Sequence, residues 1–173
     1  MKDKPYLGAS DAPSVRGTLR DDEELEGELN PDTWAGYDLP EEYKSQLPWF
    51  NEILWDKELH EYSGFNFRVI RMDWGAWNGY VFIPKGHPLH GKTYMDHQEI
   101  GELIVHGGIT YTASGEDDWI LGFDTSHGYD FSPNRKCRSF EEFTREIKNY
   151  KTHEYVVKEA KLLIDNIRRT YGT

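Results

Sequence analysis

The chain has 173 residues with one cysteine, and its 20 Lys and Arg against 31 Asp and Glu give a formal net charge of −11. This length fits one domain with a substantial core. A single cysteine excludes an internal disulfide framework and a four-cysteine zinc site, and the negative charge argues against general nucleic-acid binding through a basic face. Apolar runs are too short for a signal peptide or a membrane span, so we expect a cytoplasmic protein without a membrane partner.

Acidic residues concentrate in the N-terminal third of the chain. Residues 1–62 contain 16 acids and 6 bases, whereas residues 134–173 contain 6 acids and 10 bases. Residues 1–33 hold few apolar side chains, which bury too little surface to offset the entropy of ordering. We therefore expect a poorly ordered acidic arm over residues 1–33 and a single domain over residues 34–173. Alternatively, residues 11–42 mimic a phosphate backbone and dock on a basic partner.

Two stretches after the arm have helical character. Pro40, Glu41 and Glu42 are typical of a helix start, with proline early and acids in the first turn. Residues 49–62 place apolar side chains along one stripe at helical spacing. This spacing predicts an amphipathic helix.

Residues 65–83 predict a β-hairpin. Residues 65–72 are rich in β-formers, and residues 80–83 return as a second strand. Asn78-Gly79 offers the positive φ that a tight turn needs. Trp77 then lies at the tip, where its ring can stack on a base or sugar or pack beneath the arm.

A second hairpin is predicted from residues 102–113 and 119–124, which are joined by an acidic turn. Pairing Ala113 with Trp119 collects the apolar side chains of both strands on one face, Tyr111 among them. The same register places His106 on the polar face, diagonally from Asp124 at roughly 7–8 Å.

The C-terminal third is predicted to be helical. Ser139 with Glu142 forms a capping box at the start of one helix. Thr152 caps a second helix, which ends before Gly172. All these elements predict an α+β fold, in which an antiparallel sheet of two β-hairpins is packed by an N-terminal helix and two C-terminal helices.

Paired glycines interrupt the second hairpin. Gly107 and Gly108 lie in a stretch otherwise rich in β-formers, where glycine weakens a strand. Such glycines usually mark a bulge or the close approach of a ligand or another chain.

Two imidazoles and two carboxylates gather at the open end of this hairpin: His106, Asp124, His127 and Asp130. As nitrogen and oxygen ligands, they suit a divalent metal ion. Alternatively, an aspartate orients one imidazole for general acid–base catalysis. In a third, purely structural interpretation, Asp124 caps its loop and the histidines bind backbone carbonyls.

Other reactive residue types carry weaker signals. Cys137 has no neighbouring base in the sequence to activate its thiol, so we interpret it as a bystander. His87 and His90 have the spacing of a chelating pair, but glycine and proline around them predict an ordinary turn.

Four segments carry a resemblance to a known family: GYVFIPKGHPLHGK, VHGGITY, WILGFDTSHGYD and THEYVVKEAKLL. The chain resembles, over about residues 66–170, a family of small uncharacterised proteins of phages, prophages and bacteria, with motifs VHGGxTY and GFDxxHxxD. Thr125 departs from the relatives, which often have cysteine there. The resemblance implies an accessory or counter-defence role.

The leading hypothesis is a non-enzymatic phage or mobile-element accessory protein in the host cytoplasm. It would act as a counter-defence inhibitor that binds a host defence protein or a small nucleotide-like ligand, without a cofactor and possibly as a homo-oligomer. The predicted ligand-binding residues are His106, Gly107, Gly108, Tyr111, Asp124, His127, Asp130 and Trp77. One alternative is a metal-dependent hydrolase, with a divalent metal on His106, Asp124, His127 and Asp130. The other is an acidic mimic that inhibits a nucleic-acid-binding enzyme.

Overall fold

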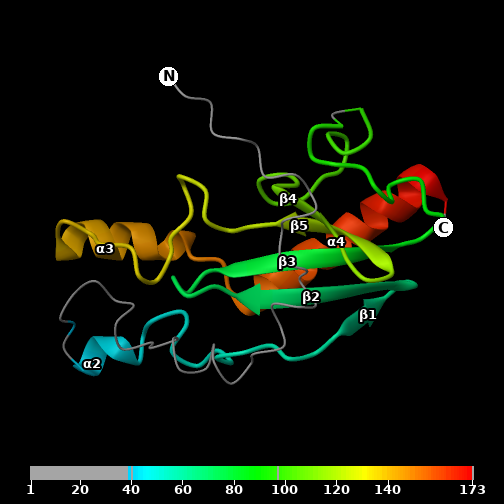
Figure 1. Ribbon diagram of the computed structural model, residues 1–173. Helices are drawn as coiled ribbons and strands as arrows, with labels where there is room; N and C mark the ends of the chain where they lie inside the picture. The colour runs from blue at the N-terminus through cyan, green and yellow to red at the C-terminus, as the bar shows by residue number, and fades with distance from the viewer. Residues whose placement is uncertain (1–38, 40, 97, 173) are drawn as a thin grey trace, which may run out of the picture.

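The computed structural model describes residues 39, 41–96 and 98–172 (Figure 1). The predicted acidic arm and the domain boundary at residue 34 lie outside the described residues. The elements follow in the order α2 (Glu41–Lys44), β1 (His60–Tyr62), β2 (Phe65–Arg71), β3 (Trp77–Pro84), β4 (Tyr111–Ser114), β5 (Asp118–Phe123), α3 (Phe140–Glu146), the 3-10 helix η2 (Ile147–Asn149) and α4 (His153–Tyr171).

The strands form one antiparallel sheet in the order β1-β2-β3-β5-β4. Helix α4 crosses one face of this sheet and contacts β3 and β2, while α3 lies beyond the end of the sheet (Figure 1). The predicted α+β fold, with a short N-terminal helix and two C-terminal helices on an antiparallel sheet, is confirmed. No helix in the described ranges has both the length and the apolar character needed to cross a membrane.

The two faces of the sheet carry separate apolar clusters because side chains alternate along each strand. The larger cluster joins the sheet to α4 and includes Phe67, Val81 and Leu121, each fully buried. On the opposite face, Phe82 and Ile120 form a smaller cluster with Tyr80 and Tyr111.

The C-terminal helices begin where the sequence predicts. Ser139 Oγ accepts a hydrogen bond from Glu142 N, and Thr152 Oγ1 accepts one from Tyr155 N. Gly172 ends α4 with φ of 74°, in the left-handed region. Helix α4 is therefore held at both ends by the predicted caps.

The predicted amphipathic helix over residues 49–62 is wrong. This segment consists of turns and extended backbone that lead into β1. Phe50 and Ile53 from the expected apolar stripe are 54% and 50% exposed. Instead Glu52 points inward, where its carboxylate accepts hydrogen bonds from Arg71 and other buried donors. These tertiary bonds outweigh the local helical pattern.

The turn of the first hairpin is also displaced from its predicted position. Asn78 and Gly79 lie inside β3, opposite Ile70 and Val69. The chain reverses at residues 72–76, where Gly75 supplies the positive φ of 86°. Gly79 serves packing instead, because a Cβ there would overlap the ring of Phe123 on β5.

The second hairpin is shorter than predicted and shifted by one residue. Strand β4 begins only at Tyr111, and Ala113 pairs with Ile120 rather than with Trp119. Tyr111 consequently lies opposite Gly122, whose missing side chain makes room for it and for Tyr80. This register puts Tyr111 in the smaller cluster, on the other face of the sheet from the one predicted.

Candidate functional site

Two predicted histidines converge on one buried carboxylate. His106 Nε2 lies 2.9 Å and His127 Nδ1 lies 3.1 Å from Asp130 Oδ2. The same oxygen accepts a hydrogen bond of 3.1 Å from the backbone N–H of His127. The Asp130 side chain is completely buried, whereas that of His127 is 23% exposed. The cluster therefore reaches the surface through His127.

Helix α4 holds His106 from behind. His106 Nδ1 lies 2.9 Å from the Tyr155 hydroxyl, and the backbone N–H of His106 donates to Glu159 at 2.8 Å. Burial, with the nearby carboxylates of Glu159 and Asp130, raises the pKa of Tyr155. The hydroxyl thus keeps its proton at neutral pH and can both donate and accept.

Some hydrogen-bonding capacity in the cluster is unused. Within the described part of the chain, His127 Nε2 and Asp130 Oδ1 are buried atoms without a hydrogen-bond partner. Lys151 Nζ is 3.8 Å from that Asp130 oxygen, which is ion-pair distance rather than a hydrogen bond. Buried polar atoms without partners are uncommon and often mark the place of a water or an ion.

Gly107 permits the close approach of the His127 ring to the loop that carries His106. Gly108 plays no part in this approach. A Cβ on Gly107 would overlap the His127 ring, and its φ of 67° is left-handed. Gly108, at φ of 85°, has nothing near the place of a Cβ. The close approach predicted from the paired glycines is therefore that of a protein ring at Gly107.

Asp124 lies at the margin of the cluster and caps its own loop. Its carboxylate accepts hydrogen bonds from Thr110 Oγ1 at 2.7 Å and from Ser126 N at 2.9 Å. It is 3.7 Å from His127 Nδ1. His106 precedes β4 and is not part of a strand, because the chain turns at Gly107 and Gly108, whose φ is positive; the hairpin register predicted for His106 and Asp124 therefore does not apply.

The two aromatic residues predicted for ligand stacking lie away from this cluster. Trp77 is fully buried, with Arg71 over its ring and His153 against its edge. Tyr111 packs edge-on against Tyr80 on the opposite face of the sheet. The exposed ring beside the cluster is instead Tyr129, which is 61% exposed and stacks on His127.

Three further side chains that the sequence singled out, those of Thr125, Cys137 and His87, lie outside this His–Asp cluster. Thr125 is buried and donates a hydrogen bond to Trp77 O at 2.8 Å. Burial raises the pKa of the Cys137 thiol and lowers that of His87. His87 Nδ1 accepts a hydrogen bond from the N–H of Leu89 within its own turn.

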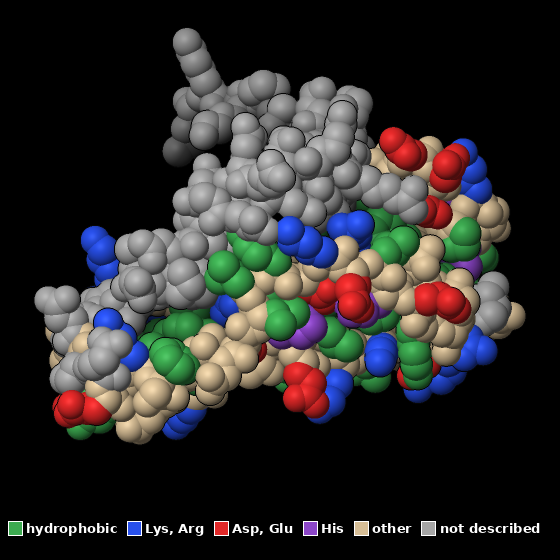
Figure 2. All heavy atoms as spheres, turned by 90° about the horizontal axis from the view of Figure 1, so that it is seen from below, with side chains coloured by type: hydrophobic (Ala, Val, Ile, Leu, Met, Phe, Trp, Pro, Cys, Tyr) green, Lys and Arg blue, Asp and Glu red, His purple; other side chains and the backbone are tan. Residues whose placement is uncertain are grey.

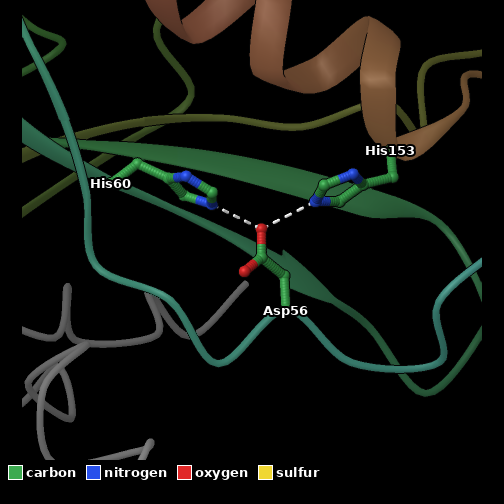
Figure 3. Close-up of side chains that lie close together, drawn as sticks. All are labelled: Asp56, His60 and His153. Atoms are coloured by element: carbon green, nitrogen blue, oxygen red, sulfur yellow. Dashed lines mark hydrogen bonds and ion pairs between the residues drawn. The ribbon is translucent and has the colours of Figure 1, made fainter.

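A second His–Asp cluster, absent from the sequence predictions, lies at the start of α4. Asp56 Oδ2 is 2.7 Å from His60 Nε2 and 2.6 Å from His153 Nε2 (Figure 3). The four-residue spacing of Asp56 and His60 is the signal that the sequence offers. The contribution of His153, which is 97 residues away from Asp56, depends on the tertiary fold.

Comparison with known proteins identifies no relatives. No family model, no curated protein and no solved structure matches the chain. The resemblance to the phage and bacterial family stays an expectation. Function is therefore argued from the site itself.

Both clusters offer two imidazole nitrogens and one carboxylate oxygen close together. Among the described residues, these two clusters bring at least three potential metal ligands together. One consists of His106, His127 and Asp130, and the other of Asp56, His60 and His153. Figure 2 shows a face of the molecule on which histidine side chains reach the surface beside acidic ones. Such mixed nitrogen and oxygen sets suit zinc and neighbouring transition metals better than magnesium or calcium.

Proposed function

We propose that the protein is a divalent-metal-dependent hydrolase of phosphate esters, with the ion held by His106, His127 and Asp130. The convergence of the two imidazoles on the Asp130 carboxylate carries this proposal. Two histidines and one carboxylate are a ligand set of hydrolytic zinc enzymes, in which the fourth position stays open for water or substrate. When bound, the ion would supply an activated water and polarise the substrate.

The spacing of the ligand atoms is compatible with such an ion. Zinc bonds of about 2.0–2.1 Å in tetrahedral geometry separate neighbouring ligand atoms by about 3.3 Å. The observed separations of 2.9 and 3.1 Å would therefore need only a small expansion. With Nε2 of His106 on the ion, its Nδ1–H donates to the Tyr155 hydroxyl and fixes the tautomer.

The charges around the cluster favour a cation inside it and an anion next to it. Asp130, Asp124 and Glu159 surround the two imidazoles, so a divalent ion gains favourable interactions there. Lys151 Nζ lies 3.8 Å from Asp130 Oδ1 with its side chain partly exposed, which places a positive charge beside the cluster. These features support an ester of phosphate as the substrate class.

Binding of a nucleotide-like ligand without turnover is the second candidate function. The exposed Tyr129 ring, stacked on His127, favours it because a base can lie on a solvent-facing aromatic ring. Binding to a host defence protein and inhibition by an acidic mimic stay predictions.

The test uses a protein in which the other His–Asp cluster of the described residues is disrupted. Chelator-treated Asp56→Asn protein is titrated with Zn²⁺ and Mn²⁺, and hydrolysis of p-nitrophenyl phosphate and bis(p-nitrophenyl) phosphate is followed. We expect one ion per chain and metal-dependent hydrolysis. Adding Asp130→Asn should weaken zinc binding at least about 100-fold and abolish turnover.

Asp124→Asn is the matched control, because Asp124 lies at the margin and already has two hydrogen bonds. It should change zinc affinity by less than about tenfold. Absence of stoichiometric ion in the Asp56→Asn protein would overturn the proposal. An ion bound without hydrolysis, together with thermal stabilisation by a nucleotide that Tyr129→Ala abolishes, would establish the second candidate instead.

A further inference from the structure

Two stretches that are distant in the sequence meet at Asp56. Asp56 lies in the extended segment before β1, His60 begins β1, and His153 begins α4. Both imidazoles point their Nε2 atoms at the same carboxylate oxygen, as Figure 3 shows. The histidines approach this oxygen from opposite sides, one from the sheet edge and one from the helix.

The Asp56 carboxylate is buried and charged. Its side chain is 3% exposed, and Oδ1 accepts a hydrogen bond from the N–H of Glu58 at 3.0 Å. The second oxygen, Oδ2, faces the Nε2 atoms of both imidazoles.

The two imidazoles are held in place yet remain accessible. The His60 ring stacks on Phe67 with centroids 4.8 Å apart, and the edge of the His153 ring meets Trp77 at the same distance. Their side chains are 22% and 21% exposed. Packing thus holds both rings in place, while part of each side chain faces solvent.

Further contacts resemble the outer shell that supports metal ligands. His153 N–H donates to Glu52 Oε1 at 2.9 Å, which fixes the first turn of α4. The other ring nitrogen of His60, Nδ1, lies 3.9 Å from Glu58 Oε2. At 3.9 Å this is ion-pair distance and not a hydrogen bond, so the Glu52 contact is the one that holds a ligand residue in place.

We propose that Asp56, His60 and His153 form a second site for a divalent transition-metal ion of the zinc class, separate from the site of the proposed function. Two nitrogens and one oxygen leave a fourth position for water at the exposed side. The present separations of 2.6 and 2.7 Å must open toward about 3.3 Å, which the partly exposed rings can provide. The ion would join the segment before β1 to the sheet edge and α4, so its binding would stabilise the folded protein.

The test separates the two sites by crossing variants. Zinc stoichiometry and the zinc-dependent shift of Tm are measured for the full chain carrying no change, Asp130→Asn, Asp56→Asn, or both. Asp130→Asn protein should retain one ion and a zinc-dependent rise in Tm. The double variant should retain neither.

His60→Ala in the Asp130→Asn background is the second variant, because it leaves the Asp56–His153 pair intact. It should weaken zinc binding at least about 100-fold. His90→Ala, outside both clusters, should leave affinity unchanged. An Asp130→Asn protein that binds zinc equally well with and without Asp56→Asn, or that binds none, would overturn the second site. If the site at His106, His127 and Asp130 does not bind zinc but the second site does, the unaltered chain will bind one ion, and Asp56→Asn by itself will abolish this binding. That result would contradict the proposed function and leave the second site standing.

Discussion

Gly107 sets the distance between the loop that carries His106 and the loop that carries His127. The His127 ring occupies the space where any side chain at position 107 would begin. Gly108 has the same left-handed backbone but open space beside it. Substitutions at these two glycines therefore distinguish the cost of a left-handed backbone, which both share, from the cost of steric overlap, which only Gly107 has.

Gly107→Ala should destabilise the protein by about 3 kcal/mol and displace His127, because it adds an overlap to the backbone strain. Gly108→Ala should lose only about 1–2 kcal/mol from the left-handed backbone. Urea unfolding measures both losses, and zinc titration of the Asp56→Asn background reports on the cluster. Equal losses in the two variants, with zinc binding intact, would contradict this explanation.

At the scale of elements, the segment of residues 49–59 shows how polar contacts fix a stretch without regular structure. Glu52 Oε2 accepts hydrogen bonds from Arg71 at 3.1 Å, Trp77 at 3.2 Å and Tyr150 at 2.6 Å. The Arg71 side chain is 1% exposed, and Glu52 supplies a negative charge beside its buried guanidinium. Burial raises the pKa of Tyr150, which keeps its hydroxyl a donor. One carboxylate thus joins the segment to β2, β3 and the turn before α4.

Glu52→Gln should destabilise the protein by about 3 kcal/mol, because it replaces the charged acceptor beside the buried Arg71 guanidinium with a neutral one. Limited proteolysis should then cut within residues 49–59 faster than in the unaltered chain. Glu58→Gln is the control from the same segment, since its side chain is 81% exposed, and it should change stability by less than about 0.5 kcal/mol. Similar unfolding free energies for the two variants would contradict the role of Glu52.

The sequence was sufficient for elements whose signals are local. Caps at Ser139 and Thr152 and the β-rich stretch 65–71 could be recognised from a few neighbouring residues. The segment of residues 49–59 could not, because Glu52 is drawn inward by donors far away in the chain. The pattern of apolar spacing carries no information about such partners.

The same limit applies to the candidate site. His106, His127 and Asp130 could be predicted as a group because they surround one hairpin. Their partner Tyr155 and the whole contact between Asp56 and His153 depend on where α4 crosses the sheet. The register of β4 likewise depended on the space above Gly122, which only the packing of Tyr80 and Tyr111 reveals.

For the whole molecule, Asp56 predicts how stability depends on pH. Its pKa is lowered from 3.8 to about 2 in the folded protein. A lowered folded-state pKa stabilises the protein above the unfolded pKa, and this contribution disappears as the pH falls through the folded value. The loss should therefore occur between about pH 4 and pH 2.

In the presence of a chelator, the free energy of unfolding of the unaltered chain should fall by about 1–2 kcal/mol more than that of Asp56→Asn between pH 4 and pH 2, after allowance for solvent screening. Unfolding free energies measured by urea at several pH values give this difference. Asp117→Asn is the control, since its side chain is 78% exposed, and it should follow the unaltered chain. Parallel pH curves for Asp56→Asn and the unaltered chain would show that the two imidazoles do not stabilise the carboxylate.

The first turns of α4 support both His–Asp clusters. His153 belongs to one cluster, and Tyr155 binds His106 of the other. Residues two apart on a helix point in directions about 200° apart, so the two clusters lie on nearly opposite sides of the same turn. Any rotation or shift of this turn changes the geometry of both. If both clusters bind an ion, a shift of this shared turn on binding at one would be transmitted to the other, and thermodynamic linkage would make that effect equal in the two directions.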